Sequence, residues 1–223
     1  MLQANTLQFL RQLNKNNSKT WFDANRAKYE NARTDFAGFV QTLIDKFAAT
    51  EPDIKNLKAK DCMFRINRDI RFSRDKSPYK NNFGAFVCKG GKKSPLAGYY
   101  FHCQPGAAFI GGGLWSPLPP ALKKVRQEID YCFDEFKKIT TSKKFAKVYG
   151  DLSMSDEYRL TKVPQGFDKE APAAEYLRLK SFVAMRPVSD AELVSKDLVK
   201  ISREAFEALA PMIAFLNRPL EDE

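Results

Sequence analysis

The chain is poor in the side chains that most metal and nucleophile sites use. It has a single histidine, His102, among 223 residues. Its four cysteines are widely spaced and include no CxxC pair: Cys62, Cys88, Cys103 and Cys132. This pattern excludes a disulfide framework and lacks the ligand spacing of a zinc site. Alternation along a strand would also point His102 and Cys103 to opposite faces, so we expect no metal, no cofactor and a histidine that is paired within a sheet.

Long apolar runs are also missing. No segment approaches the roughly 18 apolar residues of a membrane-spanning helix, and no apolar stretch follows a charged N-terminal region. We therefore expect a cytosolic protein that neither crosses a membrane nor is secreted. Internal repeats, low-complexity tracts and linkers are absent too, while 43% of the residues are hydrophobic. A single domain over residues 1–223 is the expectation.

The charge is unevenly distributed along the chain. The formal net charge is +10, yet residues 151–223 hold ten basic and fourteen acidic side chains. Residues 61–104 hold nine basic and only three acidic ones. This excess favours an anionic partner such as nucleic acid, a nucleotide or a phosphorylated metabolite. The alternative is that solvated lysines keep a cytosolic protein soluble. Nothing in the sequence indicates an oligomeric state.

The spacing of apolar residues predicts helices before and after a group of strands in the chain. Leu7, Leu10 and Leu13 predict a first helix, and Ser18 is the expected N-cap of a second. Proline residues at 119 and 120 introduce a helix that we expect to run to Phe136. The strands are expected at 62–72, 83–89, 97–104, 107–112 and 182–187. Because helices and strands are grouped rather than alternating, the fold class is predicted to be α+β, with a mainly antiparallel sheet and helices packed on one face.

The densest charge lies in residues 65–80, which read RINRDIRFSRDKSPYK. Read with a period of two, this stretch predicts a half-buried strand. Its apolar face would hold Phe64, Ile66, Ile70 and Phe72. Arg68 falls on that face, where a charge is costly unless it is paired.

Arg68 is therefore predicted to be partly buried and held by a partner. The partner is either a carboxylate, Asp69 or Asp75, or a bound anion. The other arginines of the stretch should be more exposed than Arg68: Arg65, Arg71 and Arg74.

A binding site for a phosphate-bearing anion is the function that this stretch favours. The candidate binding residues are Arg65, Arg68, Asp69, Arg71, Lys76, Tyr79 and Lys80. Three glycines and a tryptophan further along the chain could support the site, either by letting the backbone approach a ligand or simply as a bulge made for packing. These are Gly111, Gly112, Gly113 and Trp115.

Two alternatives remain open for the same residues. In a phosphate-handling enzyme, Asp69 or Asp75 would act as a base and Tyr79 as an acid. In a purely structural network, the ion pairs would tie the strand to the loop that follows and bind no ligand.

The sequence resembles a bacterial and fungal family that carries only a domain-of-unknown-function label. The resemblance lies in the segment from Phe9 to Phe22, with its Asn16-Asn17 pair, in R-x-x-R-D-x-R-F-x-x-[DN]-K-x-x-Y-K over residues 65–80, and in the Gly-Gly-Gly-Leu-Trp stretch before the prolines. It implies one compact α+β domain and marks the motif residues named above. It implies no activity.

Overall fold

The segments with apolar residues at helical spacing form helices, which come before and after a group of strands in the chain. The computed structural model describes residues 1–71 and 74–221. Its helices are α1 (Ala4–Lys15), α2 (Lys19–Ala24), α3 (Arg26–Phe47), α4 (Ala59–Cys62), α5 (Pro119–Tyr131), α6 (Phe133–Thr140), α7 (Lys143–Tyr149), α8 (Ala174–Leu177), α9 (Asp190–Leu193) and α10 (Leu198–Glu221). Its strands are β1 (Phe83–Val87), β2 (Gly98–Cys103), β3 (Ala108–Leu114) and β4 (Phe182–Val188). The predicted α+β class is confirmed.

Several helices begin where the sequence offers a cap. The Ser18 hydroxyl accepts a hydrogen bond from the Trp21 amide at 3.3 Å, as predicted for the start of α2. Ser189 and Glu192 form a capping box at the start of α9. The helix predicted from the prolines to Phe136 is instead two helices, because the α-helical backbone is interrupted at Cys132 between α5 and α6.

The four strands form one antiparallel sheet in the order β1-β2-β3-β4. Alternation along β2 separates its two faces. Tyr99, Phe101 and Cys103 are almost completely buried, and Phe101 lies 4.7 Å from the Phe39 ring of α3. The residues between them, Tyr100 and His102, are only partly buried. Helices therefore cover one face of the sheet, as predicted.

Two of the predicted strand boundaries are wrong. The strand predicted at 62–72 is absent from the described part of that range, residues 62–71, since α4 ends at Cys62 and only isolated bridges follow. β3 does not stop at its glycines but continues through them to Leu114. The sheet takes its fourth strand from residues 182–188, close to the predicted 182–187.

The chain divides into two compact units, and strands β2, β3 and β4 each contribute residues to both. The first unit comprises Met1–Lys93, Tyr100–Ile110 and Pro187–Glu204, and the second comprises Ser94–Tyr99, Gly111–Arg186 and Ala205–Glu223. In the first, Phe36 lies 5.4 Å from Phe83 and packs with the other α3 aromatics. In the second, Phe136 lies 5.2 Å from Phe215. Within the described part of the chain, no helix combines the length and the apolar character needed to cross a membrane.

The glycines of β3 are explained by close strand packing. A Cβ on Gly111 would meet the Ala184 carbonyl of β4, and one on Gly113 would meet the Phe182 carbonyl. Gly113 also has φ of +128°, which L-residues with side chains rarely adopt. These positions therefore need glycine for the sheet itself.

Gly113→Ala should destabilise the protein by more than about 1 kcal/mol, because the new methyl group meets the backbone and the φ angle is unfavourable. Gly38→Ala is the matched control. Gly38 lies within α3 with nothing within 4 Å of an added Cβ, so alanine should stabilise by about 0.5–1 kcal/mol. Urea unfolding measures both; effects of the same sign would contradict this explanation.

Candidate functional site

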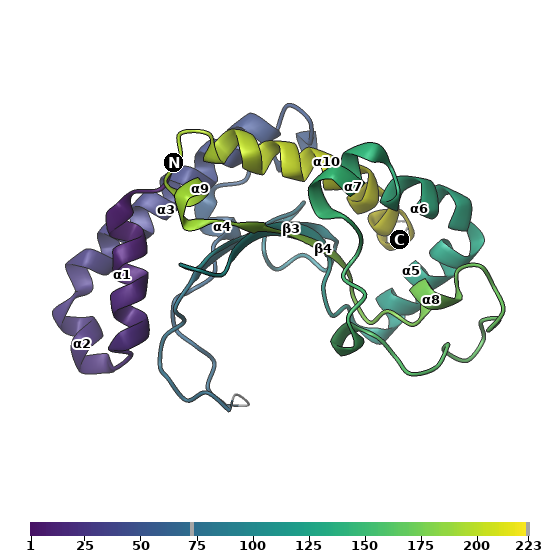
Figure 1. Ribbon diagram of the computed structural model, residues 1–223, viewed down its shortest axis with the longest axis horizontal. Coiled ribbons are helices and arrows are strands. Elements are labelled where there is room, and N and C mark those ends of the chain that lie inside the picture. The colour runs from purple at the N-terminus through teal and green to yellow at the C-terminus, as the bar shows by residue number, and fades with distance from the viewer. Residues whose placement is uncertain (72–73, 222–223) are drawn as a thin grey trace. The chain divides into compact units, whose positions relative to one another are not determined.

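Residues 64–71 and 74–82 form the two arms of a loop that extends away from the sheet (Figure 1). We call this loop the basic ribbon. Its arms are joined by an isolated antiparallel bridge between Asn67 and Tyr79, and Met63 and Ala85 form a second bridge at its base. Between the two bridges, the arm from Tyr79 to Ala85 has two more residues than the arm from Met63 to Asn67, so the longer arm bulges. The ribbon is thus paired locally and is not a continuous strand.

The predicted apolar face of this segment is only partly correct. Ile66 is 4% exposed, as expected. Phe64 and Ile70 are 39% and 42% exposed, so the expectation that they are buried is wrong. Phe72 lies outside the described residues. Alternation buries a side chain only where a second layer covers that face, and the ribbon arms pair mainly with each other.

Asn17 fixes the ribbon to the helical corner between α1 and α2. Its side-chain amide donates to the Tyr79 carbonyl at 2.9 Å and accepts from the Tyr79 amide at 3.1 Å. The Tyr79 ring stacks on Phe22 of α2, with ring centroids 4.0 Å apart and planes inclined by 12°. We call this arrangement the Asn17–Tyr79 clamp. No role was predicted for Asn17 from the sequence, although this residue belongs to a segment on which the family resemblance depends.

Arg68 is paired with a carboxylate, which is one of the two kinds of partner predicted for it. Its guanidinium lies 3.1 Å from Asp75 and donates to the Tyr79 carbonyl at 3.3 Å. The Arg68 side chain is 26% exposed, against 75% for Arg71. Hydrogen bonds from Ser77, and the Arg68 charge to a smaller degree, hold the pKa of Asp75 below its usual value.

Two cations near the ribbon tip, Arg71 and Lys76, bind groups of the ribbon itself, while Arg74 is exposed. Arg71 donates to both oxygens of Asp69, at 3.0 and 2.7 Å, and these hydrogen bonds lower the pKa of that carboxyl. The Lys76 ammonium donates to the Ile70 carbonyl at 2.8 Å. Arg71 and Lys76 are therefore engaged with other groups of the tip.

Three cations gather on the arms instead: Arg65, Arg68 and Lys80. The Lys80 ammonium lies 5.6 Å from the centre of the Phe64 ring. Burial lowers the pKa of Lys80, and the charges of Arg65 and Arg68 lower it further. Among the described residues, neither Arg65 nor Lys80 forms a salt bridge with a carboxylate. We call these three residues the cationic cluster.

Aromatic rings line the sheet beside this cluster, on the face opposite α3. Phe64 lies 6.3 Å from Tyr100 of β2, and Tyr100 lies 5.6 Å from Phe109 of β3. Phe109 stacks on His102 at 4.8 Å with planes inclined by 13°. These four residues form what we call the aromatic face. The sequence did not identify Phe64 or Phe109 as stacking residues.

His102 is paired within the sheet, as predicted. Its Nε2 lies 3.1 Å from the Gln104 side-chain oxygen, which accepts a hydrogen bond and so places the proton on Nε2. The Tyr100 hydroxyl, 3.2 Å from Nδ1, then donates to the unprotonated nitrogen. Burial lowers the pKa of His102 and raises that of Tyr100 to about 12. The pair is therefore neutral near pH 7.

The glycine and tryptophan residues proposed as support lie in the second unit. Gly111, Gly112 and Gly113 are buried within β3, where strand packing accounts for them. Trp115 is 58% exposed, and its ring meets the edge of Tyr158 at 5.1 Å. Of the two interpretations of the glycines, the packing one explains their geometry.

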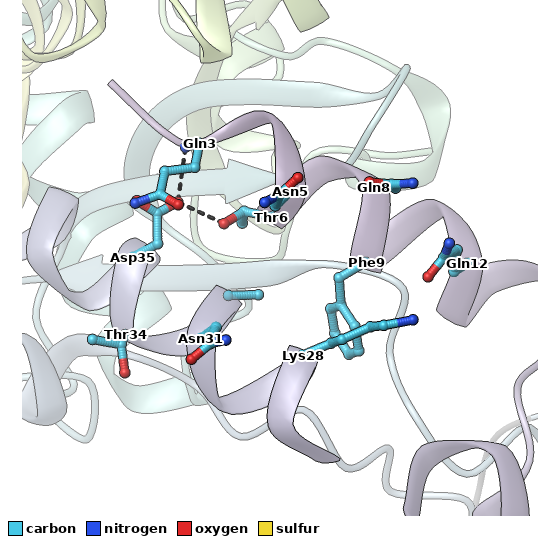
Figure 2. Close-up of a pocket in the computed structure, with 11 residues that line it drawn as sticks. Gln3, Asn5, Thr6, Gln8, Phe9, Gln12, Lys28, Asn31, Thr34 and Asp35 are labelled. Carbon is cyan, nitrogen blue, oxygen red and sulfur yellow. Dashed lines mark hydrogen bonds between the residues drawn. The ribbon is translucent and has the colours of Figure 1, made fainter. Parts of the chain in front are cut away.

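A polar groove of about 570 Å³ lies between α1 and α3. Figure 2 shows Asp35 pointing toward the start of α1, where its carboxylate accepts from the Gln3 amide at 2.9 Å and the Thr6 hydroxyl at 2.6 Å. Asp35 thus caps α1 from a neighbouring helix. Lys28 extends past Phe9 in the same view, on the other part of the groove. Asp35, the only carboxylate among the described residues that line this groove, therefore has a structural role.

Acid–base chemistry finds little support in the ribbon. Asp69 and Asp75 both have lowered pKa values, whereas a general base works best with a pKa near the working pH. The Tyr79 ring is 6% exposed beneath the clamp. Burial raises the pKa of the Cys62 thiol to about 11, which disfavours a thiolate nucleophile. Within residues 1–71 and 74–221, no group of three His, Cys, Asp or Glu side chains could hold a metal ion.

Asn17→Ala should lower the free energy of unfolding by about 1–3 kcal/mol, because it leaves the Tyr79 amide without its partner and the Tyr79 carbonyl with only the longer hydrogen bond from Arg68. Asn31→Ala, on the exposed surface of α3, should change it by less than about 0.5 kcal/mol. Chemical denaturation measures both variants. Equal effects would mean that the clamp does not stabilise the fold.

The lowered pKa of His102 predicts a pH dependence of stability. Unfolded His102 takes up a proton near its ordinary pKa of about 6.5, whereas folded His102 does so only at lower pH. The stabilisation is therefore complete above about pH 6.5 and is lost as the pH falls through the folded pKa. His102→Gln, which removes the only histidine, should flatten the dependence of unfolding free energy on pH between about 8 and 5. Identical slopes in both proteins would contradict this prediction.

Comparison with known proteins identifies the family. A family model described as a conserved hypothetical protein (DUF2461) matches residues 5–215, which is nearly the whole chain. No curated protein and no solved structure matches. The predicted resemblance to an uncharacterised domain-of-unknown-function family is confirmed by this match. The chain belongs to the DUF2461 family of conserved hypothetical proteins.

Proposed function

We propose that the basic ribbon binds a phosphate-bearing anion at the cationic cluster. The observation that carries the proposal is the gathering of Arg65, Arg68 and Lys80, close enough for the arginines to lower the pKa of Lys80. Like charges held together raise the free energy of the folded state. A bound anion would offset that cost.

The chemistry of these side chains suits phosphate. A guanidinium presents a planar fork that can bind two phosphate oxygens, and an ammonium adds a compact charge. Lys80 is half-buried beside the Phe64 ring, which limits its hydration and strengthens its attraction for an anion. The anion would therefore bind along the arms of the ribbon and not at its tip.

A structural ion-pair network explains only part of the ribbon. It accounts for Arg71 with Asp69 and for Arg68 with Asp75. It does not account for Lys80, which forms no salt bridge among the described residues, and for Arg65 it offers only a longer-range attraction to Asp69. No particular observation favours the alternative of a phosphate-handling enzyme.

The test is thermal unfolding in pyrophosphate against sodium chloride of equal ionic strength. At a concentration ten times its dissociation constant, a ligand that binds only the folded state raises the free energy of unfolding by about 1.4 kcal/mol. In a chain of this size this raises the melting temperature by about 3–6 °C. Lys80→Gln should abolish this rise. Without ligand the same variant should unfold at the same or a higher temperature than the parent, because it relieves repulsion within the cluster.

The matched control is Lys55→Gln, which removes the same charge at an exposed position after a short 3-10 turn of the first unit. It should keep the full response to pyrophosphate. An equal response in Lys80→Gln would show that the anion acts generally on the protein, and the proposed site would then be wrong.

A further inference from the structure

We propose that the ligand is a single-stranded nucleic acid, whose phosphates contact the cationic cluster while its bases stack on the aromatic face. This inference rests on the anion binding proposed above and names the class of ligand. It follows from the juxtaposition of Lys80 of the cationic cluster with a continuous group of rings on the sheet.

The rings of the aromatic face form a connected surface. Phe64, Tyr100, Phe109 and His102 are each within 6.3 Å of the next ring. They belong to the ribbon, β2 and β3, so the surface extends across several chain segments. In the first unit α3 covers the opposite face, where Phe101 of β2 packs. A ligand could therefore reach these rings without displacing a helix.

Gly84 lets the Tyr100 ring lie close to the sheet. A Cβ at Gly84 would come 2.5 Å from the Tyr100 hydroxyl oxygen and 3.2 Å from two ring carbons. The ring thus leans over the backbone of β1 instead of standing away from the sheet. A nucleic-acid base can stack on a ring that lies close to the sheet in this way.

Charge complementarity identifies the occupant. Phe64 is 39% exposed, and Lys80 lies 5.6 Å from the centre of its ring. A nucleotide carries a phosphate and a planar base in one unit, so one strand can satisfy both groups at once. Several rings beside three cations suit several consecutive nucleotides. Duplex bases are already stacked and paired, and they are not free for such contacts.

The polar groups of the aromatic face are already used. The Tyr100 hydroxyl bonds to His102, and His102 bonds to Gln104. They are therefore engaged with each other and not available to read base edges. Recognition should depend on stacking and charge and should tolerate different base sequences.

The experiment measures fluorescence anisotropy of labelled oligodeoxythymidylate and oligouridylate, each about ten nucleotides long. Binding of either strand is the expected result. A strand of the same length without bases, and a duplex, are the comparison ligands. Both should bind more weakly than the single strands, because neither offers free bases.

Variants separate the two kinds of contact. Phe64→Leu should weaken binding by roughly 5- to 150-fold, as loss of a stacked ring does, and should leave the salt dependence unchanged. Lys80→Gln should flatten the slope of log affinity against log salt by about 0.7, as loss of one phosphate contact does. Tyr131→Leu, at a 91% exposed ring in the second unit, is the control and should bind like the parent.

Four outcomes would overturn the inference: equal binding of the strand without bases, equal binding of duplex, unchanged affinity of folded Phe64→Leu, or equally effective competition by polyglutamate. If pyrophosphate still stabilises the parent but not Lys80→Gln, the proposed anion binding stands in each of these cases. If neither pyrophosphate nor any strand binds, both proposals are wrong. The strand without bases tests stacking even where a variant fails to fold.

Discussion

The placement of the basic ribbon depends on the side-chain amide of Asn17. One carboxamide supplies both a donor and an acceptor to the backbone of Tyr79, so it takes the place of a neighbouring strand. The stacked Phe22 ring covers the same residue. A ribbon joined by isolated bridges would be marginally stable alone. The clamp therefore allows a short, highly charged segment to hold a defined backbone, which reduces the entropy lost when a ligand binds.

This backbone separates the charges of the ribbon into two groups. At the tip, Asp69 and Arg71 neutralise each other within three residues of chain. On the arms, Arg65 and Lys80 lie near Arg68, and among the described residues neither forms a salt bridge with a carboxylate. Repulsion there is tolerated because the clamp and the bridges restrain the backbone. The same sheet that buries one face of β2 leaves the other with partly exposed rings beside this cluster.

Periodicity was informative where a second layer exists and misleading where it does not. The alternation of β2 correctly separated His102 from Cys103, since α3 covers the Cys103 face. The same pattern around Phe64 predicted a half-buried strand with this ring on its buried face, yet the ring is 39% exposed. The glycines at 111–113 were ambiguous in sequence, because only the neighbouring carbonyls show that a side chain cannot fit.

The sequence by itself determined what depends on neighbouring residues: the cap at Ser18, the α+β order of elements, and the need of Arg68 for a partner. These follow from local hydrogen bonding, from periodicity and from the cost of burying a charge. Only the tertiary structure decided that Asn17 holds Tyr79, 62 residues away, and that Phe64 meets the rings of the sheet. Such contacts are set by how distant segments pack against each other, and no local pattern in the chain records that packing.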